Sequence, residues 1–495
     1  MFIHLNVHSE FSLLSGALPA VRIPALAKEQ GQGWACLTDT NGFYGAVPFV
    51  KACSEEGVKP VLGAEVGDRE KAVILARNRN GLAALNRLIT AWHLSEEIPS
   101  PPCGPSPEPV EGGRASPSIP ILGSGLRVLS KQSTSKEERG MALPPLLLSL
   151  PRDDVFILSS SPGILKNLRD FKNVFAELYA YDGIEGLRSA QATASLARGL
   201  GLPPVATARV HFETPGGDVV HRLLSAIRTR STIGSLPPGA AVSPSCFYRT
   251  EAEMRRMFEE VPGAVNRTED IASACSVDLE LGRLKPSRFH KTEDPFAFLC
   301  HEARAGLSRR LRSPSTQALE TLERELSIIR GAGMADTFLI CWDLVSWARR
   351  RDIPSVGRGS AANSLVSFAL GITHVNPLDH NLFFERFLNP HRSTPPDLDI
   401  DFGTEEREQV FRYFFQSYGE ECCAMVGTLA HLHARGALRE SAKALGYPES
   451  EVGPPLKRLS HHASLPEEFQ PFSNFPSLIS LSRLITGFPR HVATH

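Results

Sequence analysis

Long apolar runs are absent from this sequence of 495 residues. A transmembrane helix requires roughly 18 or more consecutive apolar residues, and no stretch of that length occurs, so no membrane span is expected. The first eight residues, Met-Phe-Ile-His-Leu-Asn-Val-His, also lack the basic and apolar regions of a signal peptide. Both absences favour a cytoplasmic protein.

Cysteine motifs and a dominant charge are missing as well. Nine cysteines are scattered without a Cys-x-x-Cys pair of the kind that binds zinc, and Cys422-Cys423 has no partner pair. We therefore expect free, buried thiols in a reducing compartment. The formal net charge of −1 neither favours nor excludes nucleic acid as a partner, so any basic surface has to be local, as at Arg349-Arg350-Arg351.

The length is sufficient for two to four domains. Residues 1 to 93 alternate short apolar runs with stretches of helical spacing, and residues 3–7 are the first strand candidate. This order predicts βα units and parallel strands. Residues 99–120 then contain eight prolines, a composition that predicts a disordered insertion over about 95–142. The βα pattern resumes near Leu146, and residues 250–350 are expected to be mainly helical.

The strongest chemical signal lies at residues 395–402, which read Pro-Pro-Asp-Leu-Asp-Ile-Asp-Phe. Alternation with a period of two predicts a strand with Asp397, Asp399 and Asp401 on one face and the apolar residues on the other. Three like charges on one face require a counter-charge, and Mg²⁺ prefers carboxylate oxygens together with substrate phosphates. A solvated strand face and a Ca²⁺-binding loop are the alternatives, and the absence of glycine argues against the loop.

A glycine-rich turn precedes this segment by about forty residues. Residues 357–364 read Gly-Arg-Gly-Ser-Ala-Ala-Asn-Ser and open an apolar helical run over 361–370. Glycines allow close approach of the backbone to a ligand, and a helix that starts here would direct N–H groups at a phosphate. No Gly-Lys-Ser/Thr follows, so this is not a Walker A motif, and a plain structural turn is the alternative. A phosphate-binding turn together with an aspartate strand suits metal-dependent nucleotidyl transfer.

The chain resembles the bacterial family C replicative polymerases, the α subunits of DNA polymerase III and their error-prone relatives. The resemblance rests on residues 357–364 with Leu-Gly-Ile-Thr at 370–373, Phe-Glu-Arg-Phe-Leu-Asn at 384–389 and the aspartate segment at 396–402, in the order typical of the family. It extends to Gly427-Thr428, to Arg439 and to Gly-Phe-Pro-Arg-His at 487–491. The sequences Ala-Ala-Asn-Ser and Gly-Phe-Pro-Arg-His are more similar to the error-prone branch of the family.

The resemblance implies a palm in which Asp397 and Asp399 hold two catalytic Mg²⁺ ions and Asp401 has a supporting role. It implies a third catalytic aspartate, on a strand that would follow residue 495.

For the incoming nucleotide, the resemblance implies phosphate contacts from Arg358, Gly359 and Ser360. Arg386 is a further candidate partner for a phosphate or an aspartate. A buried ion pair of Arg386 with Glu385 or Asp401 is the alternative interpretation.

The N-terminal region is similar to the PHP domain of the same family, a distorted βα barrel with a multi-metal phosphoesterase site. The landmark residues present are His8, Asp39, Glu65, Glu177 and His211. Three other ligand positions differ, because Asn6, Thr40 and Arg209 stand where the family has two histidines and an aspartate. An arginine places positive charge where cations should bind. We therefore expect a degenerate, structural PHP site that lacks phosphoesterase activity, and bound PHP metals are doubtful.

The implied fold class is α/β multidomain: a PHP-type distorted βα barrel, a mixed α/β palm of nucleotidyltransferase type and a small helical thumb. The expected boundaries are 1–272 for PHP, 273–428 for the incomplete palm, 429–486 for the thumb and 487–495 for the return to the palm.

The resemblance implies a DNA-directed DNA polymerase that adds dNTPs to a primer 3′ end, with the chain itself expected to be inactive because the third aspartate and the fingers are missing. Primer–template DNA, dNTPs and, through a missing C-terminal part, a sliding clamp and other replisome or translesion subunits are the implied partners, in a cytoplasmic, nucleoid-associated setting. A metal-dependent PHP phosphoesterase or exonuclease and a non-catalytic DNA-binding remnant are the alternatives.

Overall fold

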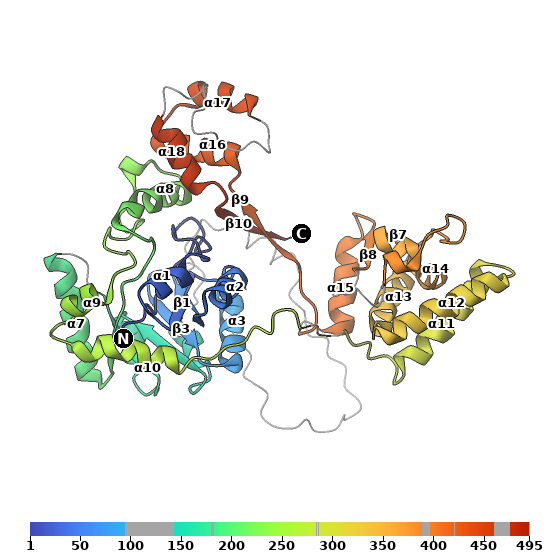
Figure 1. Cartoon of the computed structure of the whole chain (residues 1–495), viewed down its shortest axis with the longest axis horizontal. Helices are drawn as coiled ribbons and strands as arrows, with labels where there is room; N and C mark the ends of the chain where they lie inside the picture. The colour runs from blue at the N-terminus through green and yellow to red at the C-terminus, as the bar shows by residue number, and fades with distance from the viewer. Residues whose placement is uncertain are drawn as a thin grey trace. The chain divides into compact units, whose positions relative to one another are not determined.

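A computed structural model describes residues 1–94, 143–179, 183–283, 285, 287–388, 397–419, 421–459 and 476–494 (Figure 1). The chain forms two compact units, one of Met1–Leu279 with Val426–His495 and one of Glu280–Met425. Each unit has its own hydrophobic core. The insertion predicted over about 95–142 lies outside the described residues.

The first unit is built on a curled, half-barrel sheet of six strands in sequence order. The strands are β1 (Trp34–Leu37), β2 (Lys59–Gly67), β3 (Lys71–Ala76), β4 (Val155–Ser159), β5 (Val174–Leu178) and β6 (Pro204–Ala206). β1 and β2 are parallel, as are β4, β5 and β6, but β3 is antiparallel to both of its neighbours. The prediction of parallel strands is therefore wrong for β3. Only residues 68–70 join β2 to β3, whereas a parallel crossover needs about a dozen residues.

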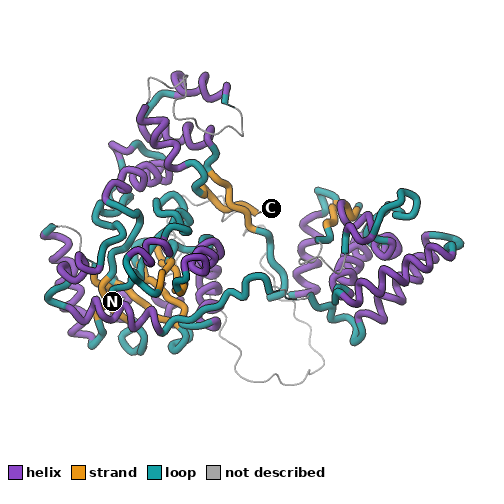
Figure 2. Tube along the Cα trace, in the orientation of Figure 1, coloured by secondary structure: helices purple, strands orange, loops and turns teal. Residues whose placement is uncertain are grey.

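Helices cover the sheet, as Figure 2 shows in purple around the orange strands. They are α1 (Ile23–Glu29), α2 (Ala46–Glu56), α3 (Arg79–Leu94), α5 (Leu143–Leu148), α6 (Pro162–Asn167), α7 (Ile184–Leu200), α9 (Glu251–Met257) and α10 (Pro262–Ser273), whereas α8 (Asp218–Thr229) packs against the C-terminal helices of this unit, described below. Because side chains alternate along a strand, Ile74 of β3 packs with Leu85 of α3, whereas Val73 belongs to a separate cluster with Ile271 of α10. Both faces of the strand are therefore buried.

The N-terminal segment does not form the strand predicted over residues 3–7. Only a bridge from Val7 to Val210 is present there. The backbone N–H of Thr38, just after β1, donates to the Val7 carbonyl at 2.8 Å, and the N–H of Val210 donates to the carbonyl of Asn6 at 2.9 Å. Residues 6 and 7 thus connect the ends of β1 and β6 and place the side chains of Asn6 and His8 at the centre of the first unit.

The region predicted as a thumb belongs to the first unit. With its flanking residues it forms β9 (Gly427–His431), α16 (Ala434–Leu445), α17 (Glu449–Arg458) and α18 (Pro476–Ile485). β10 (Pro489–Thr494) lies in the segment predicted as the return to the palm. β9 and β10 pair in antiparallel fashion. Leu223 and Ile227 of α8 pack against Ala437 of α16 and Ile485 of α18. An apolar surface of α8 therefore packs against α16 and α18.

The second unit is mainly helical. Its helices are α11 (Pro295–Arg310), α12 (Thr316–Gly331), α13 (Ala335–Arg349), α14 (Leu365–Leu370) and α15 (Arg407–Tyr418), with short 3₁₀ helices η4 (Gly359–Asn363) and η5 (Phe384–Arg386). A two-stranded antiparallel sheet of β7 (Ser355–Arg358) and β8 (Asp399–Phe402) lies against them. The helical run predicted over 361–370 is divided between η4 and α14.

Close packing of α11 on α14 predicts a selective effect of a single methyl group. A Cβ at Gly306 would lie 2.1 Å from the carbonyl oxygen of Ala369, whereas a Cβ at Gly331 meets nothing within 4 Å. We expect Gly306→Ala to destabilise the second unit by about 1–3 kcal/mol or more, because backbone atoms have to move apart. Gly331→Ala should be neutral or stabilising by up to about 1 kcal/mol.

Hydrogen exchange followed by mass spectrometry can measure both variants. Faster exchange across α11 and α14 is expected in Gly306→Ala only. Equal exchange in the two variants would show that the two helices are not packed backbone to backbone.

Candidate functional site

The pairing of β7 with β8 positions two of the predicted aspartates. The register sets Arg358 opposite Asp399 and Val356 opposite Asp401. Asp399 and Asp401 are exposed, whereas Ile400 is half-buried against the core of the second unit. The alternation predicted from the sequence is therefore present over Asp399–Phe402. Asp397 is also exposed but lies just before the strand, so the expectation that all three aspartates belong to the strand is wrong at its first residue.

A guanidinium provides the counter-charge for one of the three carboxylates. Arg358 Nε lies 3.1 Å from the carboxylate of Asp401, and both side chains are more than half exposed. An exposed pair of this kind contributes at most about 1 kcal/mol. Within the described part of the chain, no ion pair or hydrogen bond engages the carboxylates of Asp397 and Asp399. Both side chains are exposed.

The glycine-rich turn is attached to the aspartate segment. Gly359 has a φ of +61°, and a Cβ there would lie 3.7 Å from Oδ2 of Asp399. The left-handed conformation favours glycine and brings the backbone close to the carboxylate. Ser360 Oγ donates a hydrogen bond to the backbone carbonyl of Asp397 at 3.0 Å. Carboxylates, a guanidinium and a glycine turn thus meet on one exposed surface.

The sequence led us to expect that the start of the helix after this turn would be open to a phosphate. It is not open. The N–H groups of Leu365 and Val366 each donate to the carboxylate of Glu325 at 3.0 Å, and Ser364 Oγ donates to it at 2.9 Å. Glu325 belongs to α12 and is 1 % exposed. Burial raises the pKa of Glu325 to about 7. A protein carboxylate therefore occupies the position predicted for a ligand.

Arg386 does not form the buried ion pair considered as the alternative. Its side chain is exposed at the end of η5. Glu385 contacts Arg324 at 3.3 Å, and Asp401 contacts Arg358. A contact of Arg386 with phosphate stays a prediction.

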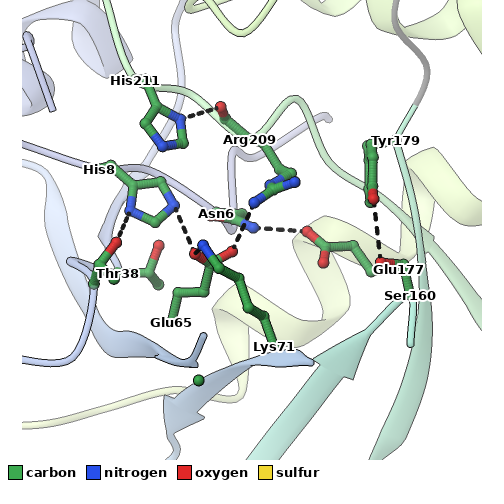
Figure 3. A network of polar contacts seen from close by, with 12 residues as sticks. Asn6, His8, Thr38, Glu65, Lys71, Ser160, Glu177, Tyr179, Arg209 and His211 are labelled. Atoms are coloured by element: carbon green, nitrogen blue, oxygen red, sulfur yellow. Dashed lines mark hydrogen bonds and ion pairs between the residues drawn. The ribbon is translucent and has the colours of Figure 1, made fainter. Parts of the chain in front are cut away.

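A second polar cluster lies at the centre of the first unit (Figure 3). Glu65 on β2 is nearly completely buried, and its carboxylate contacts Lys71 Nζ at 2.7 Å and a guanidinium nitrogen of Arg209 at 3.3 Å. His8 Nε2 lies 3.9 Å from the same carboxylate. Glu177 on β5 accepts hydrogen bonds from Asn6 at 2.8 Å and from Thr207 at 2.6 Å. The cluster thus contains two cationic side chains beside two buried carboxylates.

The two imidazoles of this cluster are buried and stacked. The ring centroids of His8 and His211 are 4.1 Å apart. Burial lowers the pKa of His8 to about 3 and that of His211 well below its usual value. His8 Nδ1 is within 3.1 Å of Thr40 Oγ1, and His211 Nδ1 is 2.8 Å from the carbonyl oxygen of Arg209. Both histidines are therefore neutral groups bound to protein partners.

Protonation of the carboxylates follows their surroundings. Burial alone would raise the pKa of Glu65, but Lys71 and Arg209 hold it well below its usual value. Burial raises the pKa of Glu177. Asp39 accepts hydrogen bonds from Ser9 and Ser12, and Ser12 Oγ also lies 3.2 Å from His8 Nδ1; burial raises the pKa of Asp39 to about 6. The predicted site residues His8, Glu65, Glu177 and His211 thus lie together, whereas Asp39 is bound by neighbouring hydroxyls.

Two residues of these sites were missed by reasoning from the sequence. Lys71 reaches Glu65 through the antiparallel turn between β2 and β3, and the signal available was a lysine at the start of an otherwise apolar run. Glu325 is separated from Ser364 by 39 residues, and no local pattern links the two. Among the described residues, no group of three or more histidine, cysteine, aspartate or glutamate side chains is arranged to hold a metal ion.

Comparisons with known proteins cover both units. The sequence matches the PHP domain family over residues 4–103 and the family described as the bacterial DNA polymerase III alpha NTPase domain over residues 297–495. Within the described residues, no helix is both long enough and apolar enough to span a membrane.

Curated relatives match the chain over its whole length. An error-prone DNA polymerase of Symbiobacterium thermophilum is 33% identical over an alignment of 513 positions, which covers 100% of this chain and 47% of that protein. The DNA polymerase III subunit alpha of Bacillus subtilis is 28% identical over an alignment of 528 positions, which covers 100% of this chain and 44% of that protein. The chain therefore spans about half the length of the curated relatives that it matches. A solved structure of an amidohydrolase from Chromobacterium violaceum is 17% identical to this chain, and the match covers 43% of this chain and 88% of the amidohydrolase chain. Its TM-score of 0.24 is too low to inform the fold.

Proposed function

We propose that this chain, which belongs with the bacterial DNA polymerase III alpha and error-prone DNA polymerases and carries their PHP and NTPase domains, supplies part of the nucleotide-binding and metal-binding site of a DNA-directed DNA polymerase. The observation that carries the proposal is the exposed surface on which Asp397 and Asp399 lie beside the Gly357–Ser360 turn. Full-length relatives named as polymerases support it.

The residues of this surface fit a divalent metal. Asp397 and Asp399 offer exposed carboxylates next to a turn suited to phosphate, and Mg²⁺ prefers such oxygens in combination with substrate phosphates. A metal bound there would neutralise negative charge on a triphosphate. Asp401 is proposed as a supporting residue, because it orients Arg358 through their ion pair.

Phosphate recognition is assigned to the turn and not to the start of α14. Arg358 provides a guanidinium, and Gly359 and Ser360 provide backbone N–H groups without a bulky side chain at the glycine. Arg386 is retained as an exposed candidate for a further phosphate contact. The substrates that follow from this assignment are dNTPs and primer–template DNA.

The remaining expectations stay proposals. The palm is assigned to 273–428, the thumb to 429–486 and the return to the palm to 487–495. A sliding clamp and replisome or translesion subunits as partners, and a nucleoid location, depend on the resemblance alone.

The PHP site is proposed to be structural. Its residues do not fit the multi-metal site of the PHP family. The carboxylate of Glu65 is already paired with Lys71 and Arg209. The carboxylate of Glu177 already accepts hydrogen bonds from Asn6 and Thr207. Cations beside the carboxylate oppose binding of further cations. A phosphoesterase activity is therefore not favoured.

Binding of dATP in the presence of Mn²⁺ tests the proposed nucleotide site. Arg358→Ala should weaken binding to the chain about tenfold, because a charge-assisted contact to phosphate is lost. The matched control is Arg412→Ala, which removes another exposed arginine of the second unit, on α15. Fluorescently labelled dATP measured by anisotropy gives both affinities, and equal affinities in the two variants would remove Arg358 from the site.

A further inference from the structure

Glu325 is a buried carboxylate that the proposed metal site does not use. Its two oxygens accept three hydrogen bonds, from Ser364 Oγ, Leu365 N and Val366 N, at 2.9 to 3.0 Å. Leu322 and Leu326 of the same helix are buried in the core of the second unit. Burying a carboxylate is costly unless it is hydrogen-bonded, so its three partners are needed to keep it there.

The three partners follow directly after the glycine-rich turn. η4 ends at Asn363, and Ser364 is the N-cap of α14. Ser364 Oγ also accepts a hydrogen bond from Ser367 N at 3.1 Å, so this hydroxyl links Glu325 to the first turn of the helix. The C-terminal end of the turn is therefore attached to α12.

The other end of the turn is attached to the aspartate strand. Gly357 and Arg358 pair with Ile400 and Asp399 in the β7–β8 ladder. Gly357 N also donates to the carbonyl of Ile372 at 2.7 Å. Between these two attachments only residues 359–363 are left, and they form the 3₁₀ turn η4. The position of Gly359 and Ser360 relative to Asp397 and Asp399 thus depends on both ends.

A carboxylate suits this attachment better than the residues of similar size. Glutamine has one acceptor oxygen, and its amide N–H₂ would face donors. Leucine would leave two backbone N–H groups buried without partners. The glutamate carboxylate accepts from all three donors through its two oxygens.

We infer that Glu325 is a positioning residue for nucleotide binding: it holds the end of the Gly357–Ser364 turn at the distance from the aspartates that a metal-bound triphosphate requires. The inference rests on the proposed function, in which the turn contacts phosphate. Misplacement of a binding group by about 1 Å can cost as much as 100-fold in a reaction, so a modest shift of the turn has a measurable effect.

The test compares Glu325→Gln with Glu323→Gln, which alters an exposed glutamate of the same helix that pairs with Arg304. In Glu325→Gln we expect faster hydrogen exchange confined to residues 359–368 and a Kd for labelled dATP with Mg²⁺ raised about tenfold. Glu323→Gln should leave both unchanged. Glu325→Asp keeps the charge and should restore part of the affinity.

Three results separate the possible failures. Unchanged exchange over 359–368 in Glu325→Gln overturns the inference alone. Faster exchange there with unchanged Kd shows a structural role only, and also overturns it. Absence of dATP binding by the unaltered chain overturns the proposed function and the nucleotide role together. Should Glu325→Gln not fold, Ser364→Ala removes one of the three donors, and the same two effects are expected at smaller size.

Discussion

Asp399→Ala is expected to weaken Mn²⁺-dependent binding of dATP by the chain roughly 100-fold. Loss of a residue that only supports a metal ligand typically lowers metal affinity by about 10- to 100-fold, and loss of a ligand itself should lower it at least as much. Asp399 is exposed, a Cβ on Gly359 would lie 3.7 Å from its Oδ2, and among the described residues no ion pair or hydrogen bond engages its carboxylate. Asp397→Ala should have a similar effect. Isothermal titration with Mn²⁺ and dATP measures both losses.

The same change should abolish catalysis in a full-length polymerase that contains this chain. Loss of one metal-binding carboxylate removes several kcal/mol of charge stabilisation, which corresponds to on the order of 10³-fold in primer extension. Asp401→Ala should cost less, because Asp401 is already paired with Arg358. Asp379→Ala removes an exposed carboxylate elsewhere in the second unit and is the matched control. Extension by Asp399→Ala at the rate of this control would contradict the assignment.

Removal of both cations from the PHP cluster should have the largest effect on stability. In Lys71→Met combined with Arg209→Met, the buried carboxylate of Glu65 loses its two counter-charges. An uncompensated buried charge typically costs about 3–5 kcal/mol, so the free energy of unfolding should fall by that amount. Urea unfolding of the chain at neutral pH measures this loss.

Two comparisons interpret that loss. Lys28→Met breaks an exposed pair with Glu56, and we expect a cost of at most about 1 kcal/mol. Adding Glu65→Met to the double variant removes the unpaired charge and should recover much of the stability, since apolar replacements of buried ion pairs are often neutral. A double variant as stable as Lys28→Met would mean that the cluster contributes little to the fold.

Absence of metal binding in the first unit is a separate expectation of the structural PHP site. The pKa of Glu65 is held low by protein cations, so a transition metal has to displace Lys71 or Arg209 to bind. Added Mn²⁺ or Zn²⁺ should therefore leave the thermal unfolding of the Asp397→Ala/Asp399→Ala double variant unchanged. Stabilisation that disappears on His8→Gln would reveal a metal at the PHP site.

Local patterns in the sequence predicted the elements that local physics determines. Alternation of aspartate with apolar residues predicted β8, and the glycines predicted the turn before α14. The strand begins at Asp399 and not at Asp397, because its length depends on pairing with β7, which is remote in the sequence. Residues 3–7 have the sequence pattern of a strand. The backbone of this segment forms hydrogen bonds to Thr38 on one side and to Val210 on the other, which amount to a single β-bridge and not to a strand.

Side chains that act across long separations could not be predicted. Arg209 at a ligand position indicated that the PHP site is altered, but the contact of Lys71 with Glu65 depends on the antiparallel turn between β2 and β3. Glu325 belongs to an ordinary amphipathic helix, and its role emerges only when α12 packs against α14. Glu325 is a charged group inside a core and Lys71 is a half-buried charge at the start of an apolar strand, and a hydrophobic pattern treats both as irregularities.

Anomalous scattering from a crystal of the chain grown with Mn²⁺ and dATP tests the central claim most directly. The account predicts a manganese peak at Asp397 and Asp399 with the triphosphate against the Arg358–Ser360 turn, and no peak at Glu65, where Lys71 and Arg209 remain bound. A manganese peak at Glu65 and His8, with none at the aspartates, would contradict it.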